Sequence, residues 1–289
     1  MTNQPVITVE RLTFCYPKAP DPAIEGLDFE VGRGEIVGFL GPNGAGKSTT
    51  QKILIRLLRG YSGSVSVLGR DLSQWDNDYF ERVGVAFETP NHFLKLTARE
   101  NLAYFRSLYS ARTLDPESLL EVVGLSAAGS LRVSQFSKGM KTRLSIARAL
   151  LNDPELVFLD EPTGGLDPVG ARELKELIKQ QRRAGKTVFL TTHDMTVADE
   201  LCDRVALLVD GQVRLLAPPR QLKLEHGEHR VRVEYLADGG TTVCEFPLAG
   251  LGDDPEFLSL LRSRDIQTLH SLEATLEDVF IKVTGRELR

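Results

Sequence analysis

"GPNGAGKST", residues 41–49, is the most informative segment of the chain. It meets the pattern G-x-x-x-x-G-K-[ST] with Gly41, Gly46, Lys47 and Ser48. Glycines at these positions let consecutive backbone N–H groups turn inward around phosphate oxygens, and a following helix adds the positive end of its dipole. A lysine here reaches the β and γ phosphates, and the serine hydroxyl can ligate Mg²⁺. The stretch therefore predicts a phosphate-binding loop rather than a flexible glycine turn.

The segments on both sides of this loop favour the same conclusion. Before it, residues 35–40 form the apolar run "EIVGFL", which is typical of a buried strand. After it, "KSTTQKILIRLLRG", residues 47–60, carries apolar side chains at helical spacing as far as Leu58 and ends on a glycine. We expect a strand, the loop and a helix in that order.

The rest of the first 220 residues alternates strand and helix patterns. Residues 6–14 and 27–40 favour β structure, residues 97–152 are mostly helical, and short apolar runs return at 156–161 and 187–194 with a helix pattern between them. Strands that alternate with helices imply a largely parallel sheet. We therefore predict an α/β fold that contains a helical insert over about residues 97–152.

The character of the sequence changes after a double proline at residues 218–219. Residues 221–289 combine strand and helix patterns and include an expected turn, "ADGG", at residues 237–240. We expect a boundary near residue 220, with one domain over residues 1–220 and a small C-terminal α+β domain over residues 221–289.

Charge, cysteine content and hydropathy exclude several classes of protein. A formal net charge of -5 gives no overall electrostatic reason to bind nucleic acid, so we expect no such partner. Cys15, Cys202 and Cys244 are odd in number and lack metal-ligand spacing, which favours ordinary thiols in a reducing compartment. No signal-peptide pattern opens the chain and no apolar run approaches the roughly 18 residues that cross a bilayer, so we expect a cytoplasmic protein without a transmembrane segment.

Two candidate catalytic segments follow apolar runs. "LVFLDE", residues 156–161, ends on Asp160, which would face Mg²⁺, and on Glu161, which can accept a proton from an attacking water. His193 follows the run "VFLTT". An ordinary strand end and a structural histidine are the alternatives. Because ligands of open α/β sheets lie outside the carboxyl ends of the strands, we favour a nucleotide site.

"FSKGM", residues 136–140, has the form of a second phosphate site. Ser137 is a good helix N-cap, Gly139 permits close approach of a backbone, and the following helix carries lysine and arginine near its N-terminus. The alternative is a capped amphipathic helix with a solvated basic face, since Met140 and Leu151 belong to an apolar stripe along it.

Taken in order, these motifs resemble those of the ATP-binding subunit of an ATP-binding cassette (ABC) transporter, over roughly residues 5–220. The resemblance implies a P-loop NTPase core with an antiparallel β subdomain, and hydrolysis of ATP with Mg²⁺. It implies ATP binding by the whole loop: Gly41, Pro42, Asn43, Gly44, Ala45, Gly46, Lys47, Ser48 and Thr49. Lys47 is then also catalytic, Ser48 and Asp160 hold the metal, Glu161 is the general base, and His193 steadies the γ-phosphate and the water.

The same resemblance implies that the protein works as a pair. "GGLDP", residues 164–168, matches the D-loop of this family and puts Asp167 at the subunit boundary. "FSKGM" occupies the signature motif, whose Ser137 and Gly139 complete the site of the other subunit. We therefore expect a homodimer or a dimer with a related ATPase subunit. Tyr16 corresponds to the residue that stacks on adenine, although strand packing also explains a tyrosine there.

The sequence departs from the family at two motifs. Glu88 stands where the family usually has glutamine, and Phe136, Lys138 and Met140 replace the commoner signature residues. A carboxylate at residue 88 attracts Mg²⁺ and repels phosphate, and at about 4 Å and an effective dielectric near 20 each unit-charge pair is worth about 4 kcal/mol. Because these energies oppose each other, we hypothesise that Glu88 keeps the metal-contact role.

The resemblance also indicates the partner and the direction of transport. It implies a separate integral membrane permease that docks on residues 89–102, at the cytoplasmic face of the cell membrane. "ATLEDVFIKVTGREL", residues 274–288, resembles the carboxyl end of bacterial drug and antibiotic exporters. The alternative is a soluble ABC-type ATPase that acts on a non-transport macromolecule, but the chain lacks the second cassette or long coiled coil that those types need.

Overall fold

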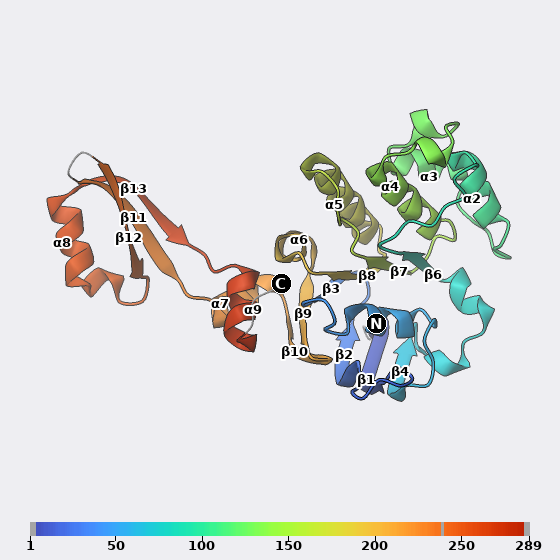
Figure 1. Cartoon of the computed structure of the whole chain (residues 1–289), viewed down its shortest axis with the longest axis horizontal. Coiled ribbons are helices and arrows are strands. Elements are labelled where there is room, and N and C mark those ends of the chain that lie inside the picture. The colour runs from blue at the N-terminus through green and yellow to red at the C-terminus, as the bar shows by residue number, and fades with distance from the viewer. Residues whose placement is uncertain (1–3, 238–239, 286–289) are drawn as a thin grey trace. The chain divides into compact units, whose positions relative to one another are not determined.

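A double proline separates two compact units in the computed structural model, which describes residues 4–237 and 240–285 (Figure 1). The first unit ends at Pro218 and the second begins at Pro219. Asp238 and Gly239 of the expected turn lie outside the described residues, as do the last residues of the exporter-like tail.

The first unit is built on two sheets. One is antiparallel, in the order β2-β1-β4-β5, and comprises β1 (Ile7–Phe14), β2 (Ile24–Val31), β4 (Ser62–Val67) and β5 (Arg70–Asp71). The other has the order β10-β9-β3-β8-β7-β6 and is parallel except at β10. Its strands are β3 (Ile36–Leu40), β6 (Val83–Ala86), β7 (Leu156–Asp160), β8 (Thr187–Thr192), β9 (Arg204–Val209) and β10 (Gln212–Ala217). The predicted α/β class with a largely parallel sheet is confirmed.

Helices cover the parallel sheet and form the predicted insert. Figure 1 draws α4 and α5 on one side of this sheet and the antiparallel sheet on the other. The helices of this unit are α1 (Lys47–Leu54), α2 (Ala98–Arg106), α3 (Pro116–Val122), α4 (Lys138–Ala149), α5 (Pro168–Arg183) and α6 (Met195–Leu201). Thr97 starts α2 through a capping box with Glu100, because each side chain satisfies a backbone N–H of the other.

The core between the two sheets is aromatic. Ring centroids of Phe29 and Phe39 lie 4.8 Å apart, those of Phe39 and Phe189 lie 4.7 Å apart, and none of the three residues is more than 4% exposed. Phe39 belongs to β3 and Phe189 belongs to its neighbouring strand β8. Packing of these rings therefore fixes where the carboxyl ends of both strands lie.

One helix differs from the prediction. The pattern in residues 47–60 predicts a helix to about Leu58, but α1 ends at Leu54. Arg56 adopts a left-handed φ of 61°, which no helix continues through, and Leu57 is 58% exposed. Spacing alone does not reveal this break, because the apolar residues beyond it still fall at helical intervals.

The second unit is a small α+β domain. Its sheet has the order β12-β11-β13, and its core consists mainly of Val231, Val233, Phe246 and Phe257. The elements are α7 (Pro219–His226), β11 (Arg230–Ala237), β12 (Gly240–Pro247), α8 (Pro255–Ser263), β13 (Asp265–Leu272) and α9 (Leu276–Thr284). The sequence did not predict α7, although a proline at the first helical position is favourable because its missing N–H has no intrahelical partner.

Short 3₁₀ turns complete the described elements: η1 (Leu72–Gln74), η2 (Asn77–Glu81), η3 (Ser126–Ala128), η4 (Val133–Gln135) and η5 (Leu251–Asp253). All three cysteines are free thiols. Within the described ranges, no helix has both the length and the apolar character that crossing a bilayer requires.

Candidate functional site

The phosphate loop joins the end of β3 to the start of α1, and its glycines are forced by neighbouring backbone and side chains. Gly46 has a φ of 104°, and a Cβ there would lie 2.6 Å from Cγ2 of Ile24. A Cβ on Gly41 would lie 2.3 Å from the carbonyl oxygen of Leu208. Because real Cβ atoms do not approach so closely, only glycine fits at either position without a shift of the chain.

Lys47 is held inside this loop. Its Nζ donates to the carbonyl oxygens of Gly41 at 2.6 Å and Pro42 at 3.0 Å, and the residue is 6% exposed. Burial lowers the pKa of Lys47, while the charges of Glu161 and Asp160 act in the opposite direction. An ammonium group surrounded by carbonyls and two carboxylates is thus preformed to meet a phosphate.

The carboxyl ends of β7 and β8 bring the candidate catalytic groups together. Nδ1–H of His193 donates to Oε1 of Glu161 at 2.8 Å. Glu161 itself has a left-handed φ of 45°, an uncommon conformation for a residue with a side chain. Its N–H donates to the carbonyl oxygen of Thr191 at 3.0 Å, which helps hold this turn. The carboxylate is therefore directed by the backbone and by the imidazole.

Thr191 is a polar residue of this region that the sequence analysis missed. Its hydroxyl donates to the carboxylate of Asp160, and the residue is fully buried within β8. Asp160 and Thr191 are register partners of β7 and β8. A threonine in an otherwise apolar strand run was the available signal, but its partner depends on the pairing of two strands that are distant in sequence.

One cavity of about 390 Å³ collects most of the predicted residues. Its lining includes the loop from Asn43 to Thr49 together with Tyr16, Glu88, Glu161 and His193. The hydroxyl groups of Tyr16 and Thr49 lie 3.2 Å apart, and the Tyr16 ring packs edge-on against Phe14. The cavity is not lined by Gly41, Pro42, Asp160, Ser137, Gly139 or Asp167.

The oxygen atoms beside Lys47 suit a magnesium ion. Ser48 contributes a hydroxyl and Glu88 a carboxylate to the cavity, and the Asp160 carboxylate lies close enough to influence the pKa of Lys47. Mg²⁺ prefers one or two such protein ligands and completes its shell with phosphate oxygens and water. The residues present therefore fit this ion.

The signature segment lies at the N-terminus of α4 and differs from the phosphate loop in its surroundings. Ser137 is exposed, and its Oγ accepts from the N–H of Met140 at 3.2 Å as an N-cap. A Cβ on Gly139 would meet its nearest described neighbour, Cδ2 of Leu166, at 3.6 Å, which is ordinary contact. Nothing in the described chain therefore requires glycine at this position.

Asp167 caps α5. Its carboxylate accepts from the N–H groups of Gly170 at 2.9 Å and Val169 at 3.1 Å, and these hydrogen bonds, Gly170 first, lower the pKa of Asp167. The residue thus has an intrachain role at the first turn of a 16-residue helix.

The segment after Glu88 is tied to α4. The imidazole Nε2 of His92 lies 2.9 Å from the carbonyl oxygen of Lys141 and 3.1 Å from Oγ of Ser145. Arg148 donates to the carbonyl oxygen of Asn91 at 2.7 Å. Beside these contacts lies a shallow, mostly apolar groove of about 280 Å³, lined by residues that include Leu57, Phe80, Phe87, Phe105 and Arg148.

The chain matches known proteins over nearly all of its length. Residues 24–164 match the family described as ABC transporter, and residues 229–273 match the fluoroquinolone efflux ABC transporter C-terminal domain. The chain is 56% identical over 284 residues to a fluoroquinolones export ATP-binding protein of Mycobacterium tuberculosis strain H37Rv, covering 98% of this chain and 94% of that protein. The Nod factor export ATP-binding protein I of Rhizobium meliloti is 34% identical over 311 residues, covering 99% of this chain and 90% of that protein.

Solved structures match about three quarters of the chain. The ATP-binding subunit of an ABC transporter is 32% identical, with a TM-score of 0.68, and the match covers 77% of this chain and 93% of that chain. A dimeric ATP-binding cassette in a post-hydrolysis state, bound to ADP and Pi, is 27% identical with a TM-score of 0.66, covering 73% of this chain and 98% of that chain.

Proposed function

This chain belongs to the family of ATP-binding subunits of ABC transporters, in which ATP hydrolysis energises transport, and from this premise we propose a specific working unit. Two copies, or one copy and a related subunit, close around two ATP molecules and reopen after hydrolysis. The cycle drives export through a separate permease, with this chain bound at the cytoplasmic face of the membrane.

This proposal rests on the unoccupied space next to the Cα atom of Gly139. Its own chain would tolerate a side chain there, since the nearest described atom to a Cβ is 3.6 Å away. A close approach of phosphate from a second molecule explains the glycine, because a bare backbone lets N–H groups reach phosphate oxygens. Ser137 is exposed at the same helix end and is available to the same phosphate.

Hydrolysis then needs a nucleophile, a base and stabilisation of charge. Glu161 accepts a proton from the water that attacks the γ-phosphorus, while the bond to the ADP oxygen breaks. His193, at 2.8 Å from Glu161, orients that carboxylate and steadies the γ-phosphate and the water. Lys47 exchanges its two loop carbonyls for phosphate oxygens and neutralises charge on them.

Ser48, Asp160 and Glu88 are the residues that would hold Mg²⁺. A bound Mg²⁺ would neutralise charge on the β and γ phosphates. Thr191 fixes one oxygen of Asp160, and this leaves the other oxygen for the metal side of the site. Glu88 adds a second carboxylate, where the family usually has a neutral amide.

The permease docks on residues 89–102, and the apolar groove beside this segment extends the docking surface. Leu57 is 58% exposed and Phe87 is 38% exposed there, so the groove presents apolar side chains to solvent. His92 and Arg148 connect this segment to α4, so a partner in the groove bears on the helix that begins at the signature motif. Fluoroquinolones are the proposed substrates, since the M. tuberculosis relative is named for their export.

Drug efflux by cells that express the chain with its permease tests this function. We expect intracellular norfloxacin to fall relative to cells with the permease alone, and the Glu161→Gln variant to lose that effect at equal protein level. Equal norfloxacin accumulation with wild type and variant would contradict the proposal. ATP-dependent efflux of another compound, with no effect on norfloxacin, would retain the exporter and reject the substrate.

A further inference from the structure

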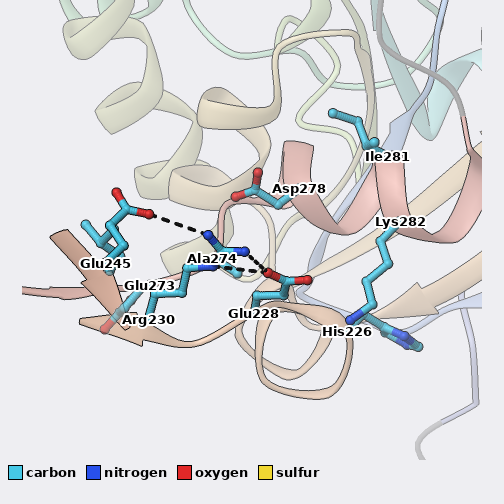
Figure 2. A pocket seen from close by; sticks show the side chains of 10 residues that line it. His226, Glu228, Arg230, Glu245, Glu273, Ala274, Asp278, Ile281 and Lys282 are labelled. Carbon is cyan, nitrogen blue, oxygen red and sulfur yellow. Dashed lines mark hydrogen bonds and ion pairs between the residues drawn. The ribbon is translucent and has the colours of Figure 1, made fainter. Parts of the chain in front are cut away.

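The C-terminal unit contains a cavity that the ATPase cycle does not use. Its volume is about 480 Å³, within the usual range for small-molecule sites, and all its lining residues belong to the second unit (Figure 2). Elements α7, β11, β12, β13 and α9 each contribute side chains.

Packing at one end keeps this cavity formed. A Cβ on Gly227 would lie 2.2 Å from Cβ of Ala274, so the end of α7 rests directly on the chain before α9. Ala274 is 6% exposed. Asp278 is engaged in the capping box of α9, where it accepts from the N–H of Thr275 at 2.8 Å and from its hydroxyl at 2.7 Å. The walls are therefore positioned without a ligand.

Three of the charged side chains in the lining are paired with one another. Arg230 donates to Glu228 at 2.7 Å and lies 3.6 Å from Glu245. Glu245 also accepts from Arg232 at 2.9 Å. In Figure 2, dashed lines join Arg230 to both carboxylates. These groups form a neutralised middle section, because each charge faces an opposite charge.

Glu273, Asp278 and Lys282 have no ion pair among the described residues, and Asp278 is already held by Thr275. The side chains of Glu273 and Lys282 make no hydrogen bond or ion pair with any described residue, and both line the cavity. Figure 2 draws Lys282 and His226 at one end and Glu273 at the other. Leu272 and Ala274 add apolar surface to the lining. The cavity thus offers an ammonium group with an imidazole, apolar contact, and a separate carboxylate.

We propose that this cavity binds a small zwitterion whose carboxylate meets Lys282 and His226 and whose protonated amine meets Glu273. An apolar body between the two charges would cover Leu272. Fluoroquinolones with a basic amine have this form, so the choice of probe rests on the proposed function, while the site rests on the lining. The C-terminal unit would then bind the exported drug itself.

Binding of norfloxacin to the full chain, measured by calorimetry with the nucleotide site filled by a non-hydrolysable ATP analogue, tests the proposal. We expect Lys282→Gln and Glu273→Gln each to weaken binding about tenfold, since each removes one charge-assisted contact. Nalidixic acid has the carboxylate but no basic amine. Its weaker binding should respond to Lys282→Gln and not to Glu273→Gln.

Glu277→Gln is the matched control, because Glu277 is a nearby carboxylate of α9 that does not line the cavity. It should leave norfloxacin affinity unchanged, and thermal unfolding should be alike for all three variants. The proposal is overturned if norfloxacin does not bind, or if both cavity variants behave like Glu277→Gln. Efflux of norfloxacin without binding to the chain would reject the cavity as a drug site and retain the proposed export function. Binding of norfloxacin without its efflux would retain the cavity and reject the proposed export function.

Discussion

The phosphate loop and the signature segment both contain glycine beside a helix N-terminus, but the chain needs those glycines for different reasons. At Gly46, φ is 104° and a Cβ would lie 2.6 Å from Ile24. At Gly139, the nearest described atom to a Cβ is 3.6 Å away. The first glycine is required by the fold of its own chain. The second has no such requirement, which points to contact with another molecule.

The charged residues of the two segments differ in the same way. Lys47 is buried and bonded to two carbonyl oxygens of its own loop. Lys138 is exposed at the first position of α4. The phosphate loop holds its lysine in place within one chain, whereas the signature segment presents its lysine to solvent. On the proposed function, a monomer has one surface that binds its own nucleotide and a second surface that binds the nucleotide of its partner.

Replacing Glu161, the proposed general base, gives the largest expected effect and leaves both segments intact. Glu161→Gln should lower phosphate release about 10²–10⁴-fold, because the amide cannot accept the proton of the attacking water. ATP affinity should change little, since Lys47 and the loop are untouched. Phosphate release and binding of a fluorescent ATP analogue measure the two quantities. Turnover near that of wild type would remove Glu161 from its assigned role.

Matched substitutions of the two glycines test the comparison itself. Gly139→Asp should reduce hydrolysis to background by repelling phosphate, yet leave monomer ATP affinity within about twofold and thermal stability unchanged, since acidic residues suit a helix N-terminus. Gly46→Ala should instead weaken monomer ATP binding and destabilise the fold. Loss of monomer binding in Gly139→Asp would place the signature inside its own site.

Local pattern predicted the phosphate loop, whereas the role of Gly139 followed only from the family resemblance. The strand, loop and helix around residues 41–49 follow from hydrophobic periodicity and from glycine chemistry, which act over short distances. The space around Gly139 depends on Leu166, which is distant in the sequence. Thr191 was missed for the same reason, because its bond to Asp160 depends on how β7 and β8 pair.

Replacing Glu88, which lines the phosphate-loop cavity, with the glutamine usual in the family should have a moderate effect on hydrolysis. We expect Glu88→Gln to keep hydrolysis within about tenfold of wild type, because attraction to Mg²⁺ and repulsion of phosphate oppose each other at about 4 kcal/mol each. Phosphate release over a Mg²⁺ titration measures this. Complete loss of hydrolysis with unchanged ATP binding would show that the charge itself is required.

The smallest expected effect concerns His92, which contacts Lys141 and Ser145 of α4, the helix that begins at the signature segment. Burial lowers the pKa of His92, and the positive charges of Arg148 and Lys141 lower it further, against the hydrogen bond to the Lys141 carbonyl. Below the ordinary histidine pKa of about 6.5, the unfolded chain takes up a proton that the folded chain disfavours, so stability falls as the pH falls.

Denaturant unfolding at pH 7.5 and 5.5 checks this dependence. Wild type should lose more free energy of unfolding over this interval than His92→Gln, which cannot titrate. An equal loss in both proteins would mean that His92 is not held neutral against α4.

The C-terminal unit shows where sequence patterns stop being informative. Its strands and two of its helices were predicted from alternation and helical spacing, but its cavity was not. Glu273 and Lys282 are nine residues apart, and their shared cavity exists only because α7 packs beside α9. Hydrophobic periodicity identifies each helix or strand, but it does not indicate which side chains from different helices and strands line the same cavity.

The mass of the Glu161→Gln protein in solution tests whether this chain carries halves of two different sites. With ATP and Mg²⁺, light scattering should give the mass of two chains, and without ATP the mass of one. Adding Gly139→Asp should return the protein to one chain while ATP stays bound. A single-chain mass for Glu161→Gln at saturating ATP, or a dimer that survives Gly139→Asp, would contradict the account.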